Sequence, residues 1–295
     1  MNGMTEWHIF AARSFFFHTK YTALRNSSLL WKLEGDTLPG SSYLFGTMHV
    51  RDRRAFQQLA TVYEKIGECE GFAAEFHLES TDHDFDAGAM QLPAGQRLSG
   101  FYPPKKYKKY RSILLKGTGL DIAHFDHALP FVVLNLATEH LLQQDLPVPL
   151  DQHLWNFAKT ADKSLHGIET FREQIEVLRK ISLEEQLNML GGMCKNIGRF
   201  RHYLLRLTEL YETSQVQQLY KLVKRNTKGM RQLMLYRRNE VMAERISGLV
   251  REQRLFVAIG AAHLGGGKGV LRLLKHAGLK LTPVRMANPS DLLPG

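Results

Sequence analysis

Apolar residues in this chain form short runs near both ends, whereas helical spacings dominate the part between them. Short apolar runs bounded by turn residues are typical of buried strands. The predicted strands cover residues 29–34, 41–48, 71–76, 163–169, 255–259 and 279–284.

Segments whose apolar positions recur every three or four residues are expected to form amphipathic helices. The predicted helices cover residues 52–68, 103–115, 131–144, 151–160, 182–211, 214–225, 230–249 and 270–276. Residues 79–97 lack such a pattern and are expected to form a loop. His77 and His83 lie in an acidic stretch, residues 75–86, that overlaps the start of this loop. A solvated loop is the favoured interpretation of that stretch, and a loosely bound cation is the alternative.

This order of elements predicts an α/β fold with a mainly parallel central sheet, built from the N- and C-terminal segments. Pro39 and Gly40 between the first two strands predict an antiparallel hairpin at one edge. We expect residues 1–27 to be an N-terminal extension and 286–295 a C-terminal tail. Residues 28–285 are expected to form one domain with a large helical insertion at about 98–250.

Composition is ordinary for a globular protein: 295 residues, 44% hydrophobic and 23% charged, are enough for a sizeable core. Two cysteines, Cys69 and Cys194, provide neither a disulfide framework nor a CxxC metal motif. No transmembrane segment is predicted, because no apolar run approaches the roughly 18 residues that cross a bilayer. The N-terminus lacks the features of a secretory signal, so the sequence favours a cytoplasmic location.

A net charge of +10 raises the question of a nucleic-acid partner. The basic residues are spread along the chain and are densest at 105–109, 221–231 and 237–238. None of these blocks has the aromatic or ligand spacing of a known nucleic-acid module. Solvated faces or an affinity for acidic surfaces are therefore favoured, and no specific nucleic-acid partner is predicted. The oligomeric state is unknown from the sequence.

Two apolar runs share an ending, because residues 43–49 and 256–263 both close on Gly-x-x-His. A glycine just past a strand lets the backbone turn, which would leave His49 and His263 at the strand ends. Open α/β sheets usually place their active sites at that edge. The two imidazoles could meet only if both ends of the chain form one sheet, and such a pair would suit metal binding or proton transfer. The alternative is that each histidine makes only structural hydrogen bonds in a loop.

Two carboxylates are also expected at the ends of strands, near the two histidines. Glu75 ends a strand that is expected to lie beside Phe45, and Glu169 ends the strand before Thr170. Either carboxylate could complete a metal site with the histidines or pair with a basic residue.

Polar residues on two helices could support these ligands. Glu173 and Gln174 could hydrogen-bond to the ligands from one turn further along, while Thr170 and Glu173 also have capping-box spacing. On the late polar helix, Arg238 and Asn239 are candidates for the catalytic site. Arg238 would bind a substrate carboxylate or a developing oxyanion. Solvent exposure is the alternative for Arg238.

Seven sequence blocks together resemble the TraB/GumN family, which includes the TIKI proteases. The resemblance spans about residues 28–285, and the paired Gly-x-x-His blocks and the Gly-Ile-Glu-Thr-x-x-Glu-Gln block are its more specific parts. The blocks are residues 28–35, 42–49, 92–99, 150–154, 167–174, 238–239 and 257–264.

The resemblance implies a divalent-metal-dependent, peptidase-like hydrolase with an α/β core related to erythromycin esterase and the ChaN-like proteins. By that pattern His49 and His263 are the motif histidines, while Glu75 and Glu169 match the acidic residues at the ends of two strands. Arg238 and Asn239 match the Arg-Asn pair of the late helix. Family members commonly carry an export signal, which is not visible here, and their usual Gly-Leu-Glu-Thr reads Gly-Ile-Glu-Thr in this chain.

The sequence therefore predicts a metal-dependent hydrolase of peptides or other small substrates. Mn²⁺ or Zn²⁺ would be held by His49 and His263 with Glu75 or Glu169, and the remaining carboxylate would act as general base. A metal-independent, esterase-like hydrolase and a non-catalytic peptide-binding protein are the alternatives.

Overall fold

A six-stranded mixed sheet organises the computed structural model, which describes residues 28–79, 87–227 and 229–286. The spatial order of the strands is β4-β3-β5-β2-β1-β6. The predicted hairpin is confirmed, since β1 and β2 are antiparallel with Leu30 opposite Phe45. β2, β5, β3 and β4 run parallel to one another, and β1 is also antiparallel to β6. The strands are β1 (Leu30–Glu34), β2 (Ser42–Thr47), β3 (Gly71–Phe76), β4 (Ser164–Glu169), β5 (Leu255–Gly260) and β6 (Lys280–Pro283).

One expected neighbour was wrong, because β3 pairs with β5 rather than with the strand of Phe45. Leu255 to Ile259 of β5 are all buried, as expected for a central strand covered on both faces. The ring of Phe256 lies between two others, with centroids 5.9 Å from Phe72 of β3 and 6.2 Å from Phe45 of β2. β5 therefore inserts between the two strands that the sequence had placed side by side.

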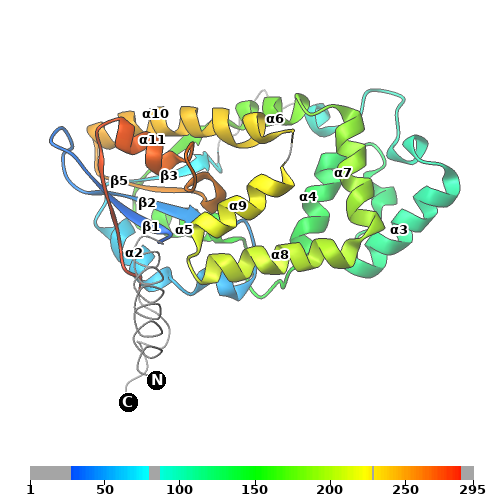
Figure 1. Cartoon of the computed structure of the whole chain (residues 1–295), viewed down its shortest axis with the longest axis horizontal. Coiled ribbons are helices and arrows are strands. Elements are labelled where there is room, and N and C mark those ends of the chain that lie inside the picture. Colours follow the sequence, from blue (N-terminus) through cyan, green and yellow to red (C-terminus); the bar gives the residue numbers. More distant parts are fainter. Residues whose placement is uncertain (1–27, 80–86, 228, 287–295) are drawn as a thin grey trace, which may run out of the picture.

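Ten α-helices are described in these parts of the chain. They cover the sheet at one end of the molecule and form a separate helical layer at the other (Figure 1). The helices are α2 (Leu59–Gly67), α3 (Pro104–Thr118), α4 (Pro130–Leu141), α5 (Leu150–Thr160), α6 (Phe171–Arg179), α7 (Leu183–Lys195), α8 (Ile197–Glu212), α9 (Val216–Asn226), α10 (Arg237–Glu252) and α11 (Val270–His276). Short 3₁₀ turns are η1 (Arg53–Phe56), η2 (Ala87–Met90), η3 (Leu98–Phe101), η4 (Ile122–Phe125) and η6 (Ala261–His263), and η5 (Gln232–Tyr236) is a π-helix.

Three predicted helices are interrupted. The segment 52–68 divides into η1 and α2, and the segment 230–249 begins as the π-helix η5. The segment 182–211 breaks at Asn196, whose backbone leaves the helical region (φ −148°, ψ 58°) and whose side chain accepts a hydrogen bond from Arg199 N. Asparagine is among the preferred residues for starting a helix in this way, and periodicity alone does not show such a break.

The segment predicted as a helical insertion contributes to both regions. Helices α3, α4 and α7 lie at the end of the molecule away from the sheet, α8 runs from that end back toward the sheet, and α9 lies between (Figure 1). The same stretch of sequence also supplies β4, which pairs with β3 inside the sheet. The predicted N-terminal extension, His83 and all but residue 286 of the predicted tail lie outside the described residues.

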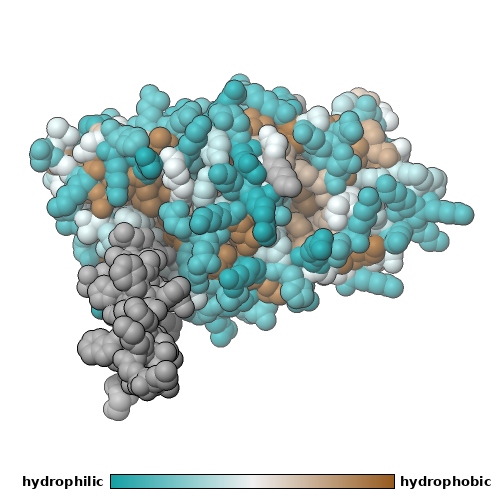
Figure 2. All heavy atoms as spheres, in the orientation of Figure 1, coloured by the Kyte–Doolittle hydropathy of each residue, from teal (hydrophilic) through white to brown (hydrophobic). Residues whose placement is uncertain are grey.

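The face of the molecule that Figure 2 shows is mainly hydrophilic, with hydrophobic residues scattered over it. Among the residues that the structure describes, no helix is both long and apolar enough to cross a membrane.

Replacement of Phe256 by alanine tests the central role of β5. This ring is fully buried between neighbouring strands, and truncation of a buried phenylalanine typically costs about 3–5 kcal/mol. We expect Phe256→Ala to lower the unfolding free energy by that amount in urea denaturation. Leu115→Ala is the control, because Leu115 is 47% exposed and its loss should cost under about 0.5 kcal/mol. Equal effects of the two substitutions would contradict this assignment of the core.

Candidate active site

The glycines of the two Gly-x-x-His motifs permit close packing rather than chain reversal, which corrects the sequence interpretation. Gly46 lies inside β2, and Gly260 ends β5 with an ordinary φ of −55°. A Cβ on Gly46 would lie 2.7 Å from Leu264 Cδ1, and one on Gly260 would lie 2.9 Å from Glu75 Oε1. The second glycine therefore allows a carboxylate to approach the strand backbone, where Gly260 N donates to Glu75 Oε1 at 2.6 Å.

A guanidinium joins the two predicted carboxylates at the carboxyl ends of the strands. Arg238 Nη2 donates to Glu169 Oε2 at 2.5 Å and to Glu75 Oε2 at 2.8 Å. Arg238 Nε also lies 3.0 Å from Glu169 Oε1. The side chains of Arg238 and Glu169 are only 14% and 4% exposed, so the solvent-exposed alternative for Arg238 was wrong. The structure thus brings together three residues from distant parts of the sequence.

Neighbouring groups keep Glu75 and Arg238 ionised despite their burial. Burial alone would raise the pKa of Glu75, but the nearby His263, the charge of Arg238 and the Gly260 N–H hold it below its usual value. Burial would likewise lower the pKa of Arg238, and its contacts with Glu169 and Glu75 raise it instead. One guanidinium faces two carboxylates, so the three side chains carry a net charge of about −1, which favours a further cation or proton nearby.

His263 is held in one orientation by Asn239. Asn239 Nδ2 donates to the carbonyl of Lys268 at 2.7 Å, which leaves Oδ1 facing His263 Nδ1 at 2.6 Å. Because an amide oxygen only accepts hydrogen bonds, Nδ1 of His263 carries the proton and Nε2 keeps its lone pair. Burial, with Arg238 nearby and despite Glu75, lowers the pKa of His263 to about 4. The imidazole is therefore a neutral base or ligand at physiological pH.

The π-helix η5 directly precedes α10 and ends at Tyr236. Arg238 is the second residue of α10. Such widened turns are rare and often occur at functional sites. The two motif residues of this helix, Arg238 and Asn239, then reach the carboxylates and His263 respectively. Nothing in the apolar periodicity of the segment 230–249 indicated the π-helix.

His49 has a different environment from His263. Its side chain is 58% exposed, with Nδ1 at 2.8 Å from Asp151 Oδ2 and Nε2 at 3.5 Å from Glu139 Oε1. Hydrogen bonds with Asp151 and then Glu139 raise the pKa of His49 to about 10. The structure thus brings His263 together with Glu75, and His49 together with two carboxylates of the helical insertion.

Three residues around the first motif were missed from the sequence. Asp151 lay inside the block 150–154 but was not assigned a role, and Glu139 carried no signal. Tyr211 of α8 is buried and donates from its hydroxyl to the carbonyl of Gly46 at 2.8 Å. Asp151 and Glu139 connect His49, two residues after β2, to helices, and Tyr211 connects β2 itself to α8. Sequence spacing does not reveal such contacts between distant segments.

Gln174 and Glu173, both predicted to support the ligands, have different roles in the structure. Gln174 Nε2 donates to Glu169 Oε2 at 3.3 Å, as proposed for a residue that supports a ligand. Glu173 instead forms the predicted capping box with Thr170. It also pairs with Arg245, whose Nη1 donates to the carbonyl of Ile168 in β4.

This site has two of the ligand atoms that a divalent cation would need. His263 Nε2 and Glu75 Oε1 are both electron-rich and lie 3.9 Å apart, a spacing compatible with two ligands of one ion bound at about 2.0–2.2 Å. The net negative charge of the cluster also suits a cation. Among the described residues, however, no group of three or more His, Cys, Asp or Glu side chains is arranged to hold a metal ion.

Comparison with known proteins assigns the chain to a family. A profile of the TraB/PrgY/gumN family matches residues 29–283, which is most of the sequence. The chain belongs to the TraB/PrgY/gumN family. The predicted resemblance is therefore confirmed, and the α/β sheet of mostly parallel strands agrees with the predicted fold class.

Curated relatives of this TraB/PrgY/gumN member carry protease names. Metalloprotease TIKI1 of Danio rerio is 24% identical over 90% of this chain and 67% of the relative. Metalloprotease TIKI2 of Danio rerio is 22% identical over 86% of this chain and 60% of the relative. The Metalloprotease TIKI homolog of Amphimedon queenslandica is 22% identical over 95% and 65%. The chain thus spans about three fifths to two thirds of the length of these relatives. No solved structure matches it.

Substitution of Gly260 tests the close approach of Glu75. In Gly260→Ala the new Cβ would lie within 2.9 Å of the Glu75 carboxylate and 3.5 Å of His263 Cδ2. We expect a loss of about 1–3 kcal/mol of unfolding free energy, as for other overpacked sites. Gly248→Ala is the matched control, because Gly248 is exposed on α10 and its Cβ would meet no atom within 4 Å. There alanine should stabilise the helix by about 0.5–1 kcal/mol, and a neutral Gly260→Ala would contradict the packing described.

The protonation of His49 can be measured directly. Because its pKa is raised from 6.5 to about 10, its contribution to stability is complete below pH 6.5 and is lost as the pH rises through 10. In NMR titrations of the metal-free protein, we expect the His49 ring to stay protonated at pH 8. Asp151→Asn should bring its pKa back toward 6.5. A His49 pKa near 6.5 in the unsubstituted protein would contradict the ion pairs described.

Proposed function

We propose that this protein is a divalent-metal-dependent hydrolase of peptides, with its site at the carboxyl ends of β3, β4 and β5. The observation that carries the proposal is the convergence of His263 Nε2 and Glu75 Oε1 beside a buried Arg238–Glu169 pair. The family assignment and the metalloprotease names of the relatives support it.

His263 and Glu75 would hold the ion in this proposal. A bound divalent ion lowers the pKa of its water to about 7 and polarises a carbonyl. Asn239 keeps the Nε2 lone pair of His263 directed at Glu75. Arg238 and Gly260 N–H keep Glu75 ionised and in place. His49 is the proposed third ligand, and it becomes available only when it loses its proton and leaves Asp151 and Glu139.

The roles of the remaining charged residues follow from their contacts. Both oxygens of Glu169 accept hydrogen bonds from Arg238, and its side chain is almost fully buried. We assign Glu169 to holding Arg238, and Glu75, which is 26% exposed, to proton transfer or ligation. Nε and Nη2 of Arg238 already donate to carboxylates, so only Nη1 would be available for a substrate oxygen.

A metal-independent hydrolase is the second candidate, and it rests on the His263–Asn239 pair. A neutral imidazole with one nitrogen fixed and the other free is suited to act as a general base on water. The two candidates differ in one measurable property, because activity that survives excess chelator supports the second and excludes the first. Stoichiometric peptide binding without any cleavage product would instead favour a non-catalytic peptide-binding protein.

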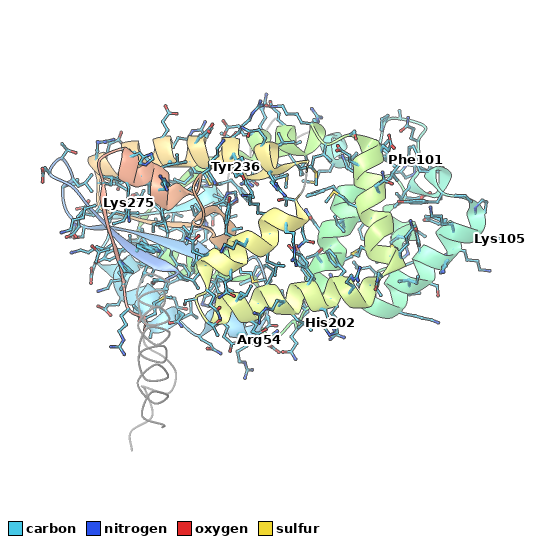
Figure 3. The ribbon with its side chains drawn as sticks, in the orientation of Figure 1. Arg54, Phe101, Lys105, His202, Tyr236 and Lys275 are labelled. Carbon is cyan, nitrogen blue, oxygen red and sulfur yellow. The ribbon has the colours of Figure 1, made fainter. Side chains whose placement is uncertain are left out.

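Metal titration of site variants tests the main proposal. We expect metal-free protein to gain activity against a peptide library on addition of Mn²⁺ or Zn²⁺, and His263→Ala and Glu75→Gln to lose about 100-fold or more, because each removes a ligand or base. His202→Ala is the control, since His202 is an exposed residue of α8 (Figure 3). Calorimetric metal binding should weaken in the first two variants only. Unchanged metal binding and cleavage in His263→Ala would exclude this site.

His49→Ala separates the proposed third ligand from the other two. If His49 binds the ion, the variant should bind metal more weakly than the unsubstituted protein. The same variant should bind metal normally if His49 serves only to connect β2 with the helical insertion through Asp151 and Glu139.

A further inference from the structure

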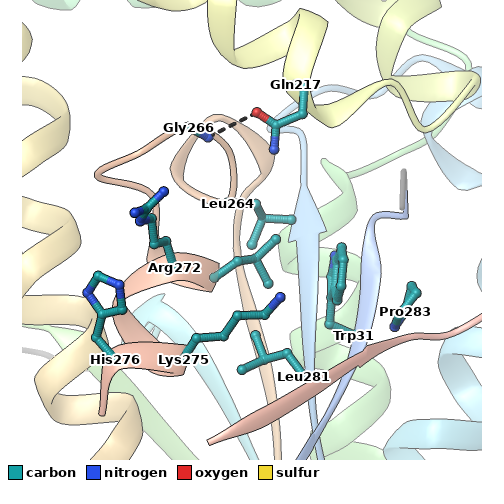
Figure 4. A pocket seen from close by; sticks show the side chains of 10 residues that line it. Trp31, Gln217, Leu264, Gly266, Arg272, Lys275, His276, Leu281 and Pro283 are labelled. Atoms are coloured by element: carbon teal, nitrogen blue, oxygen red, sulfur yellow. Dashed lines mark hydrogen bonds between the residues drawn. The ribbon is translucent and has the colours of Figure 1, made fainter. Parts of the chain in front are cut away.

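A cavity of about 460 Å³ lies between α11, β1, β6 and α9 (Figure 4). Its volume falls within the range of about 300–1,000 Å³ that is typical of small-molecule sites. Leu264 and Gly266 form part of its wall, whereas the preceding residue, His263, contacts Asn239 and Glu75. The cavity and the candidate active site are therefore separate and share one loop.

The polar lining of this cavity is basic. Arg272, Lys275 and His276 of α11 are all exposed and line it, and no Asp or Glu among the described residues does. None of these three side chains forms a hydrogen bond or ion pair with the residues that the structure describes. The side-chain oxygen of Gln217 accepts from Gly266 N at 3.1 Å, so its amide nitrogen remains as a donor on the opposite wall (Figure 4).

The rest of the lining is apolar and partly flat. Trp31 and Pro283 stand on one side, Leu281 is at the base, and Lys275 extends across toward Trp31 (Figure 4). Trp31 is only 7% exposed, and its indole N–H is already bonded to the carbonyl of Ser28 at 2.7 Å. The small part of its ring that reaches the cavity therefore offers only an apolar surface. An apolar wall facing the cationic side chains of Arg272 and Lys275 suits a ligand that has a flat apolar body and an anionic group.

We propose that this cavity binds a small organic anion, namely a carboxylate on a flat apolar body. Lys275 and Arg272 bind the carboxylate, the Gln217 amide donates to it, and the apolar body lies against Trp31. This site is additional to the proposed hydrolase and does not depend on that function.

A charged ligand and its neutral isostere test both parts of the proposal. The probe is 2-naphthoate, and 2-naphthamide is its neutral counterpart, measured by isothermal titration calorimetry on the full chain. We expect 2-naphthoate to bind about tenfold or more tightly than the amide, the preference typical of a charge-assisted hydrogen bond. Hydrogen exchange should slow at residues 264–275 when 2-naphthoate is bound, which would locate the ligand.

Paired substitutions identify the residues responsible. The double variant Arg272→Gln/Lys275→Gln should bind 2-naphthoate about tenfold or more weakly. Lys280→Gln is the matched control, because Lys280 is exposed on β6 and does not line the cavity. Circular dichroism would confirm that each variant is folded. Equal binding of the two probes, equal binding by the double variant, or no binding of 2-naphthoate at millimolar concentration would each overturn the proposal.

Discussion

The ion cluster of Glu75, Arg238 and Glu169 is the interaction on which the candidate site depends. Two strands end and one helix begins at this point, and the guanidinium hydrogen-bonds to both carboxylates with little exposure to water. Removal of one partner from such a buried group leaves an uncompensated charge, at a typical cost of about 3–5 kcal/mol. The cluster therefore fixes the relative positions of β3, β4 and α10, and its excess negative charge defines where a cation or proton would bind.

His263 and His49 occupy unequal positions relative to that cluster, although their sequence motifs are alike. His263 is buried beside Glu75 and stays neutral because desolvation disfavours its charged form. His49 is exposed and protonated because two carboxylates of the helical layer bond to it. This asymmetry connects the helical insertion to the sheet edge: a change in the position of α4 or α5 would alter the proton affinity of His49.

Local signals predicted much of the fold. Every predicted strand forms, because short apolar runs between turn residues have few other ways to be buried. The capping box at Thr170 and the hairpin of β1 and β2 were also readable, since both depend on residues close together in the sequence. The break at Asn196 and the π-helix before Arg238 were not, because they leave the apolar spacing of the surrounding helices almost unchanged.

The sequence by itself determined which residues had the chemistry for a site: two Gly-x-x-His motifs, two carboxylates at strand ends and an Arg-Asn pair. Only the tertiary structure decided how they are grouped. It inserted β5 between β2 and β3, directed Arg238 to both carboxylates, and gave His49 partners in the insertion. The physical reason is that strand order and ion pairing depend on contacts between segments distant in the chain, and residue spacing fixes only the geometry of near neighbours.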